Sequence, residues 1–245
     1  GLTAKSSIEF VKNENYWDKD NVHLDTVTLA YYDGSDQESL ERNFTSGAYS
    51  YARLFPTSSN FSKVEETYKD NIYYNPQGPG IAGLGINIDR QSYKYTSKTT
   101  DEEKTSTKKA LLNKDFRQAL NFAFDRTAYS AQLNGEKGAP LAVRNLFVKP
   151  EFVSANGKTF GDMVTEKVAT YGDEWKNVNL ADGQDGLFNA EKAKAELAKA
   201  KTALEAEGVK FPIHIDIPVD QTSKGYIARI QSFKQSVETT LGTEN

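Results

Sequence analysis

The clearest pattern of hydrophobic positions is helical spacing, which occurs three times in the second half of the chain. Within residues 115–134, 189–208 and 222–242, apolar side chains recur every three or four positions, so each segment is predicted to be a helix with one apolar face. A glycine lies at the end of each segment, as is common where helices stop. The residues suited to cap the helix starts are Asp115, Asn189 and either Thr222 or Ser223.

Alternating apolar and polar positions predict strands at residues 24–30, 48–55, 84–88 and 211–219. The last of these is the most regular, because its apolar residues alternate strictly with polar residues or proline. Strands interleaved with helices indicate an α/β or mixed α+β domain built in layers.

The remaining local signals are a short helix, a turn and two segments with no regular pattern. Ser35-Asp-Gln-Glu38 fits a capping box that opens a short helix, and Gly47 is placed to end it. Residues 75–80 are rich in Pro and Gly and predict a turn. Residues 93–109 have almost nothing to bury and are interpreted as a flexible surface insertion, and residues 136–188 are expected to be irregular.

The composition is that of an ordinary soluble globular protein. The chain has 245 residues, 38% hydrophobic and 26% charged, with a net charge of -4 and no visible basic patch, which argues against a nucleic-acid partner. It has no cysteine, so disulfides and thiolate sites are excluded. No apolar run approaches the roughly 20 residues that span a bilayer. Because the chain begins at Gly1 without a leader, we expect it to be a piece of a longer protein.

The sequence contains no pattern typical of a catalytic or cofactor site. The only histidines, His23 and His214, are expected to have structural or surface roles, and no nucleophile elbow or phosphate-binding loop is present. Residues 182–186 resemble a calcium loop only faintly, because the alternating acidic ligands are missing. We therefore expect neither an enzyme nor a bound metal or cofactor. Tyr73 and Tyr74 are the aromatic residues most suited to a ligand cleft.

Several short blocks, in order, resemble the extracellular solute-binding proteins of family 5. Asn13-Glu-Asn-Tyr-Trp17 and Leu24-Asp-Thr-Val-Thr28 resemble the family's crossing between lobes. Ser46-Gly-Ala-Tyr-Ser50 resembles a family turn, with Ser in place of the usual final Asp. Phe116-Arg-Gln-Ala-Leu-Asn-Phe-Ala-Phe-Asp-Arg126 matches a family helix closely, and Phe188-Asn-Ala-Glu-Lys-Ala-Lys194 resembles the start of the next. The long segments at 93–109 and 151–187 look most like oligopeptide-binding lipoproteins of the Ami/Ali type from Gram-positive bacteria.

This resemblance implies a fold, a function and partners. Residues 1–245 would form a single lobe, the ligand-closing one, of a type II periplasmic-binding fold with a mixed sheet flanked by helices. The whole protein would be the substrate-binding component of an ABC importer. It would hold an oligopeptide between this lobe and a first lobe of the same chain, and deliver it to the ABC permease subunits. It would lie on the extracellular face of the cell membrane, held there by a lipid anchor outside this chain.

The resemblance also suggests ligand-binding residues. Asp36 and Gln37 correspond loosely to a ligand-contacting turn, and Lys224 falls near a position that meets the peptide carboxylate. Arg53 and Tyr74 complete the set. Each also has a structural interpretation, such as helix capping for Asp36 and Gln37.

Two other functions stay open from the sequence. A surface-exposed interaction or adhesin domain would bind a host or cell-wall macromolecule through its own surface. An enzyme, such as a carbohydrate hydrolase, would need a pair of essential carboxylates, and no such pair stands out.

Overall fold

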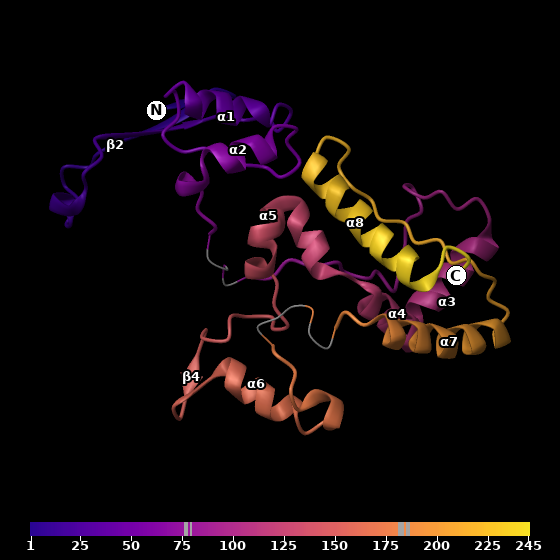
Figure 1. The fold of residues 1–245 in the computed structure, drawn as a ribbon. Helices are drawn as coiled ribbons and strands as arrows, with labels where there is room; N and C mark the ends of the chain where they lie inside the picture. Colours follow the sequence, from indigo (N-terminus) through magenta and orange to yellow (C-terminus); the bar gives the residue numbers. More distant parts are fainter. Residues whose placement is uncertain (76–77, 79, 181–183, 185–186) are drawn as a thin grey trace. The chain divides into compact units, whose positions relative to one another are not determined.

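The computed structural model describes residues 1–75, 78, 80–180, 184 and 187–245 of the chain (Figure 1). Its internal contacts divide it into two compact units, Gly1–Ala52 and Arg53–Asn245, here called unit 1 and unit 2. The sequence analysis expected one lobe across residues 1–245, and that organisation stays a prediction. None of the helices among the described residues combines the length and the apolar character that crossing a bilayer requires.

Unit 1 contains a small antiparallel sheet followed by one helix. Its elements are β1 (Leu2–Thr3), β2 (Ser7–Val11), the 3-10 helix η1 (Lys19–Asn21), β3 (Thr26–Ala30) and α1 (Glu38–Thr45). Ile8 pairs with Leu29 and Phe10 with Val27, so four apolar side chains share one face of the sheet. These side chains are exposed within unit 1. The predicted strand at 24–30 is confirmed by β3.

The helix predicted after residue 35 forms, but its cap is not the predicted one. Oδ1 of Asp36 accepts hydrogen bonds from the backbone N–H groups of Glu38 and Ser39, at 3.1 and 3.2 Å. The hydroxyl of Ser35 donates instead to Asp33 at 2.6 Å. The predicted Ser35 capping box is therefore wrong, because the carboxylate one residue later reaches the free N–H groups. Gly47 follows the helix with a φ of +79°, as expected.

Unit 2 is mainly helical. Its elements are α2 (Phe61–Thr67), η2 (Lys69–Asn71), α3 (Asp101–Leu112), α4 (Lys114–Ala123), α5 (Arg126–Ala142), β4 (Ser154–Ala155), β5 (Lys158–Thr159), α6 (Phe160–Val168), η3 (Asp173–Trp175), α7 (Ala190–Ala206) and α8 (Lys224–Leu241). Helix α4 packs against α7, with α3 and α8 beside them, and α5 packs against α8 (Figure 1). Helices α7 and α8 confirm the predictions at 189–208 and 222–242.

The core of unit 2 lies where α4 and α7 cross. Ala119 and Ala123 of α4 and Ala193 and Ala200 of α7 have no exposed surface. Because alanine has no atoms beyond Cβ, these positions let the two helix backbones approach closely. Larger side chains around them complete the cluster: Phe116, Leu120, Phe122, Leu197, Leu204, Val209 and Leu241.

The predicted helix at 115–134 is two helices. The first cap is Asn113, whose Oδ1 accepts from the N–H of Phe116 at 3.0 Å, so the prediction of Asp115 as the cap is wrong. The chain leaves helical geometry at Phe124, and Asp125 caps α5 by accepting from the N–H of Ala128 at 2.8 Å. A second capping residue within the pattern thus starts a new helix.

The segment interpreted as a flexible insertion contains helix α3 from residue 101. The hydroxyl of Thr100 accepts from the N–H of Glu103, and the Glu103 carboxylate accepts from the N–H of Thr100, which is a complete capping box. Ser106, Thr107 and Ala110 are buried, so a face of small residues packs against the neighbouring helices. Residues 101–109 therefore differ from the expectation, since small polar residues can be buried when they are hydrogen-bonded.

Residues 136–188 also contain more regular structure than expected. The backbone leaves helical geometry at Gly135, with a φ of +69°, where the helix was predicted to end, but α5 resumes beyond this kink and reaches residue 142. The hairpin β4–β5 then turns at Asn156 and Gly157 with positive φ at both, and α6 follows. The type of turn explains the hairpin, because Asn and Gly tolerate left-handed backbone angles. Most of the faint calcium loop at 182–186 and part of the turn at 75–80 lie outside the described residues.

Three predicted strands do not form. Residues 48–55, 84–88 and 211–219 have no ladder pairing with another described segment. Alternation reports which side chains are apolar, but a strand also needs a neighbouring backbone to satisfy its N–H and C=O groups. The prediction of strands at these positions is therefore wrong for this structure, although the last two segments still line the site described next.

Candidate functional site

Unit 2 contains a cavity of about 1270 Å³. Its wall is formed by residues 80–95, by residues 215–218 and by side chains from α3, α4, α5 and α8. Pockets for small ligands usually measure about 300–1,000 Å³, so this cavity has room for a larger ligand. Aromatic rings contribute to the wall, namely those of Tyr93, Tyr95, Phe124, Tyr129 and Phe233.

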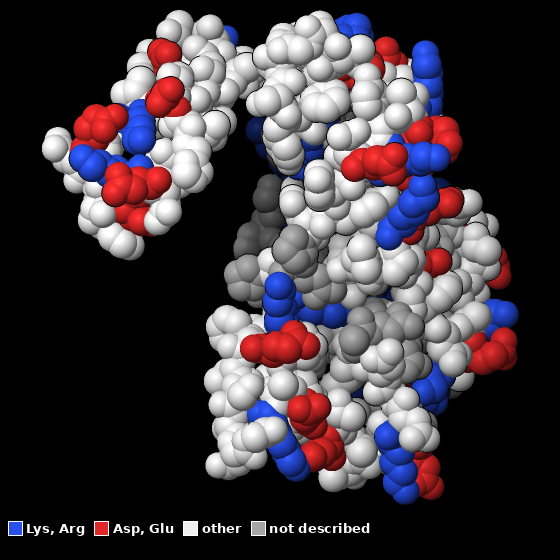
Figure 2. All heavy atoms as spheres, turned by 60° about the vertical axis from the view of Figure 1, so that its left-hand side comes forward, with Lys and Arg blue, Asp and Glu red and all other residues white. Residues whose placement is uncertain are grey.

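Positive charge is concentrated at this cavity. Of the described residues that line it, two are acidic, Asp89 and Asp216. The basic ones are Arg90, Lys94, Lys108, Arg117, Arg126, Arg144 and Arg229. The chain as a whole has a net charge of -4, and on the face shown in Figure 2 acidic and basic side chains are interspersed. The cavity therefore differs from the rest of the chain in its charge, which favours an anionic group within it.

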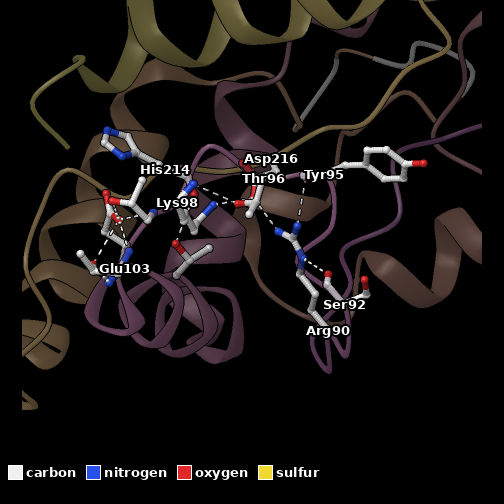
Figure 3. A network of polar contacts seen from close by, with 11 residues as sticks. Arg90, Ser92, Tyr95, Thr96, Lys98, Glu103, His214 and Asp216 are labelled. Atoms are coloured by element: carbon white, nitrogen blue, oxygen red, sulfur yellow. Dashed lines mark hydrogen bonds and ion pairs between the residues drawn. The ribbon is translucent and has the colours of Figure 1, made fainter.

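A polar cluster around Asp216 joins two distant segments at the cavity wall (Figure 3). Oδ2 of Asp216 accepts from Arg90 Nη1 at 2.5 Å, from Thr96 Oγ1 at 2.7 Å and from Lys98 Nζ at 2.7 Å. The side chains of Arg90, Lys98 and Asp216 are 24%, 0% and 12% exposed. Because the lysine has no contact with solvent, this is a largely buried ion pair.

Electrostatics keeps Asp216 ionised in this cluster. Burial by itself would raise the pKa of the carboxyl, but the hydrogen bonds from Lys98, Thr96 and Arg90 outweigh it and hold the pKa below its ordinary value. Helix α3 also contacts this segment two residues before Asp216, where the hydroxyl of Thr107 donates to the carbonyl oxygen of His214 at 3.1 Å. These contacts hold residues 214–216 in place without a sheet.

The break between α4 and α5 forms another part of the wall. The guanidinium of Arg126 donates to the carbonyl oxygens of Asn121 and Phe124 and to the side chain of Asn121, at 2.6–3.2 Å. Burial lowers the pKa of Arg126. The hydroxyl of Ser236 accepts from the N–H of Asp125 at 2.9 Å and ties the break to α8. Residues 116–126, the block that resembles a family helix, thus fix through local hydrogen bonds how α4 and α5 line the cavity.

The two predicted site residues in unit 1 hold the start of α1. Asp36 accepts from the first N–H groups of α1 and forms an ion pair with Arg42, and these contacts lower the pKa of the Asp36 carboxyl, with the Arg42 hydrogen bond as the largest cause. Gln37 occupies the N-cap position of α1. Asp36 therefore caps α1, as its structural interpretation predicts, and the ligand role of Asp36 and Gln37 stays a prediction.

The three predicted site residues in unit 2 lie outside the cavity lining. The guanidinium of Arg53 lies 4.8 Å from the centroid of the Phe55 ring. The hydroxyl of Tyr74 donates to Glu65 at 3.3 Å, and burial followed by the charge of Glu65 raises the pKa of Tyr74. Lys224 is the exposed first residue of α8. The structure does not bring these three side chains together, and their ligand roles stay predictions.

Sequence reasoning missed the residues that do line the cavity. Asp216 carried a usable signal, because it is the only acidic residue within the alternating segment 211–219. An isolated charge in an apolar segment suggests a buried partner. Arg90, Lys98 and Arg229 carried no comparable signal, since their partners lie far away in the sequence.

The comparison of sequences defines the class of protein. Residues 2–240 match the family described as bacterial extracellular solute-binding proteins, family 5 Middle, so the chain belongs to that family. The resemblance inferred from the sequence blocks is thereby confirmed.

Individual relatives are similar along the whole chain. The chain is 81% identical to the oligopeptide-binding protein AmiA of Streptococcus pneumoniae serotype 4 and 64% identical to AliA of the same strain. It is 62% identical to the oligopeptide-binding protein SarA of Streptococcus gordonii. These matches cover 100% of the chain but 37% of the length of each relative.

A solved structure supports the fold. The structure of the pheromone receptor PrgZ, which describes its mode of peptide binding, has a TM-score of 0.55 to this chain at 16% identity. The match covers 96% of this chain and 37% of PrgZ. This likeness concerns the fold alone, and together with the helices and small sheets of the structure it confirms the predicted mixed α/β class.

Proposed function

We propose that this chain is one lobe of the substrate-binding component of an ABC importer, which captures extracellular oligopeptides and delivers them to the permease. The observation that carries the proposal is the similarity, along all of this chain, to three proteins named as oligopeptide-binding, at 62–81% identity. Because the chain spans 37% of each relative, the peptide would also contact a second lobe supplied by the rest of the protein. Closure of two lobes around a ligand is a common hinge motion.

The geometry of unit 2 supports a binding role. A peptide offers backbone groups, apolar side chains and charged ends, and the cavity combines aromatic rings with polar and cationic side chains. Binding through backbone hydrogen bonds would tolerate many side chains, with ordered water filling the remaining space. In this proposal the protein has no catalytic residue, and it is held on the extracellular face of the membrane by a lipid anchor outside residues 1–245.

The first experiment is mass spectrometry of small molecules released when the full-length protein, purified from its host without refolding, is denatured. We expect a mixture of short peptides near one equivalent per protein. The same extraction from the isolated 245-residue chain is the control, and it should release little, because half a cleft buries less of the ligand. Absence of peptide from the full-length protein, together with no uptake from an added peptide library, would favour the interaction-domain alternative.

A further inference from the structure

Arg229 of α8 differs from the other arginines at the cavity in its contacts. Its guanidinium carbon lies 4.3 Å from the centroid of the Tyr129 ring and 5.6 Å from that of Tyr226. Its Nε is buried and has no hydrogen-bond acceptor among the residues that the structure describes. The other arginines of the cavity wall all donate to protein oxygens: Arg90, Arg117, Arg126 and Arg144.

A buried guanidinium donor without an acceptor is costly, because the group has lost its water without gaining a partner. The cation–π contact with the Tyr129 ring attracts the charge of the guanidinium, but it gives no oxygen acceptor to the N–H edge of the group. That edge is a rigid fork whose spacing matches the two oxygens of a carboxylate. The position of Arg229 is therefore prepared for a planar anionic acceptor.

The described residues do not supply this acceptor. Arg229 forms no ion pair with any carboxylate in the described part of the chain. Both acidic residues of the cavity wall have other partners: Asp216 accepts from Arg90, Thr96 and Lys98, and Asp89 accepts from Lys108. Because cationic side chains outnumber acidic ones around the cavity, an incoming anion would be attracted and not repelled.

We propose that Arg229 binds a carboxylate of the peptide ligand inside this cavity. The inference rests on the proposed function, since it names the chemistry by which the same protein would hold its peptide. The carboxylate has two sources, the peptide C-terminus and the side chain of Asp or Glu. In both cases Arg229 is a specificity-determining residue that favours carboxylate-bearing peptides over their neutral amides.

The test uses the full-length protein and four matched sets of alanine-rich hexapeptides. The sets carry either one Glu or one Gln, and end either in a free carboxylate or in an amide. Calorimetric titration of each set with wild-type protein and Arg229→Gln gives the affinities. We expect the variant to bind the responsible carboxylate probe roughly 10–100-fold more weakly, the range for losing a charge-assisted pair, and the neutral Gln-amide set unchanged.

The pattern across the sets identifies the source of the carboxylate. Loss confined to free-acid sets assigns the C-terminus, and loss confined to Glu sets assigns a side chain. Arg229→Lys should give an intermediate loss, because it keeps the charge but not the fork. Lys234→Gln is the control, since it removes one cation from an exposed position on the same helix and should leave all four affinities unchanged.

Other outcomes would overturn the inference in ways that can be told apart. Equal affinity of wild-type protein for all four sets would overturn the carboxylate role while leaving peptide binding intact. So would a lower melting temperature of Arg229→Gln with unchanged affinities, because the acceptor would then belong to the protein. Failure of folded wild-type protein to bind any set would overturn the proposed function itself. If Arg229→Gln does not fold, the loss with Arg229→Lys, set against the unchanged affinities of Lys234→Gln, decides the question.

Discussion

Replacing Asp216 by Asn would leave the Lys98 ammonium buried without its counter-ion. The Lys98 side chain has 0% exposure and Asp216 has 12%, so solvent could not readily replace the lost partner. Breaking a buried ion pair by removing one partner costs about 3–5 kcal/mol. Because Arg90 is 24% exposed and can reorient toward water, we expect a value near the lower end, about 3 kcal/mol. For a chain of this size, that corresponds to a fall in melting temperature of roughly 6–12 °C.

The assay is guanidinium unfolding of the 245-residue chain followed by far-ultraviolet circular dichroism. Asp101→Asn is the matched control, because Asp101 pairs with Lys104 at 3.0 Å but is 98% exposed, and such surface pairs contribute at most about 1 kcal/mol. The double variant Asp216→Asn with Lys98→Met should recover part of the loss, since no unpaired ammonium remains. If Asp216→Asn cost no more than Asp101→Asn, the cluster would be accessible to water and the reasoning refuted.

Three further predictions concern pH, the core and one close contact. The folded-state pKa of Asp216 is below its ordinary value, so the stability that this carboxylate contributes is complete above about pH 4 and is lost as the pH falls further. The difference in unfolding free energy between the wild type and Asp216→Asn should therefore shrink below about pH 4. A constant difference down to pH 2 would contradict this. Leu204→Ala should lower the unfolding free energy by about 2–5 kcal/mol, because Leu204 is 1% exposed. The control Leu112→Ala, at an exposed position, should change the unfolding free energy by less than about 0.5 kcal/mol. Equal denaturation midpoints for the two variants would place Leu204 outside the core. Gly138→Ala should lower the unfolding free energy by about 1–3 kcal/mol, because the added Cβ would lie 2.7 Å from Cδ1 of Tyr74. Adding Tyr74→Ala to this variant should recover part of the loss. An unchanged melting temperature for Gly138→Ala would show that the Tyr74 ring moves freely.

The helices show how far local patterns can be trusted in this chain. Helices α7 and α8 follow directly from apolar spacing, and Asn189 caps α7 as its residue type indicates, by accepting from the N–H of Lys192 at 2.9 Å. These signals are local, because a cap and its N–H groups lie within three residues of each other. The same spacing missed the break at Phe124 and Asp125, where a second cap competes with continuation of the helix.

Helix α3 shows where composition misleads. Its segment is rich in Thr, Lys and Glu, which favours a solvated loop, yet Thr100 and Glu103 form a capping box and Thr107 donates to the backbone of His214. The capping box was readable from the sequence as Thr followed three residues later by Glu. The hydrogen bond to His214 was not, since the two residues are 107 positions apart.

The family, the mixed α/β class and the long helices could be predicted from the sequence, because family blocks, apolar periodicity and capping residues all lie in contiguous stretches. Which polar groups meet could not be predicted in this way, because it depends on the packing of distant segments. Arg90 and Lys98 reach Asp216 across 126 and 118 positions, and Arg229 finds Tyr129 on another helix. The tertiary structure also decided that residues 84–88 and 211–219 stay unpaired among the described segments, because a strand depends on a neighbouring backbone as well as on its own side chains. The cavity and its charge arise from these long-range contacts, which no local pattern specifies.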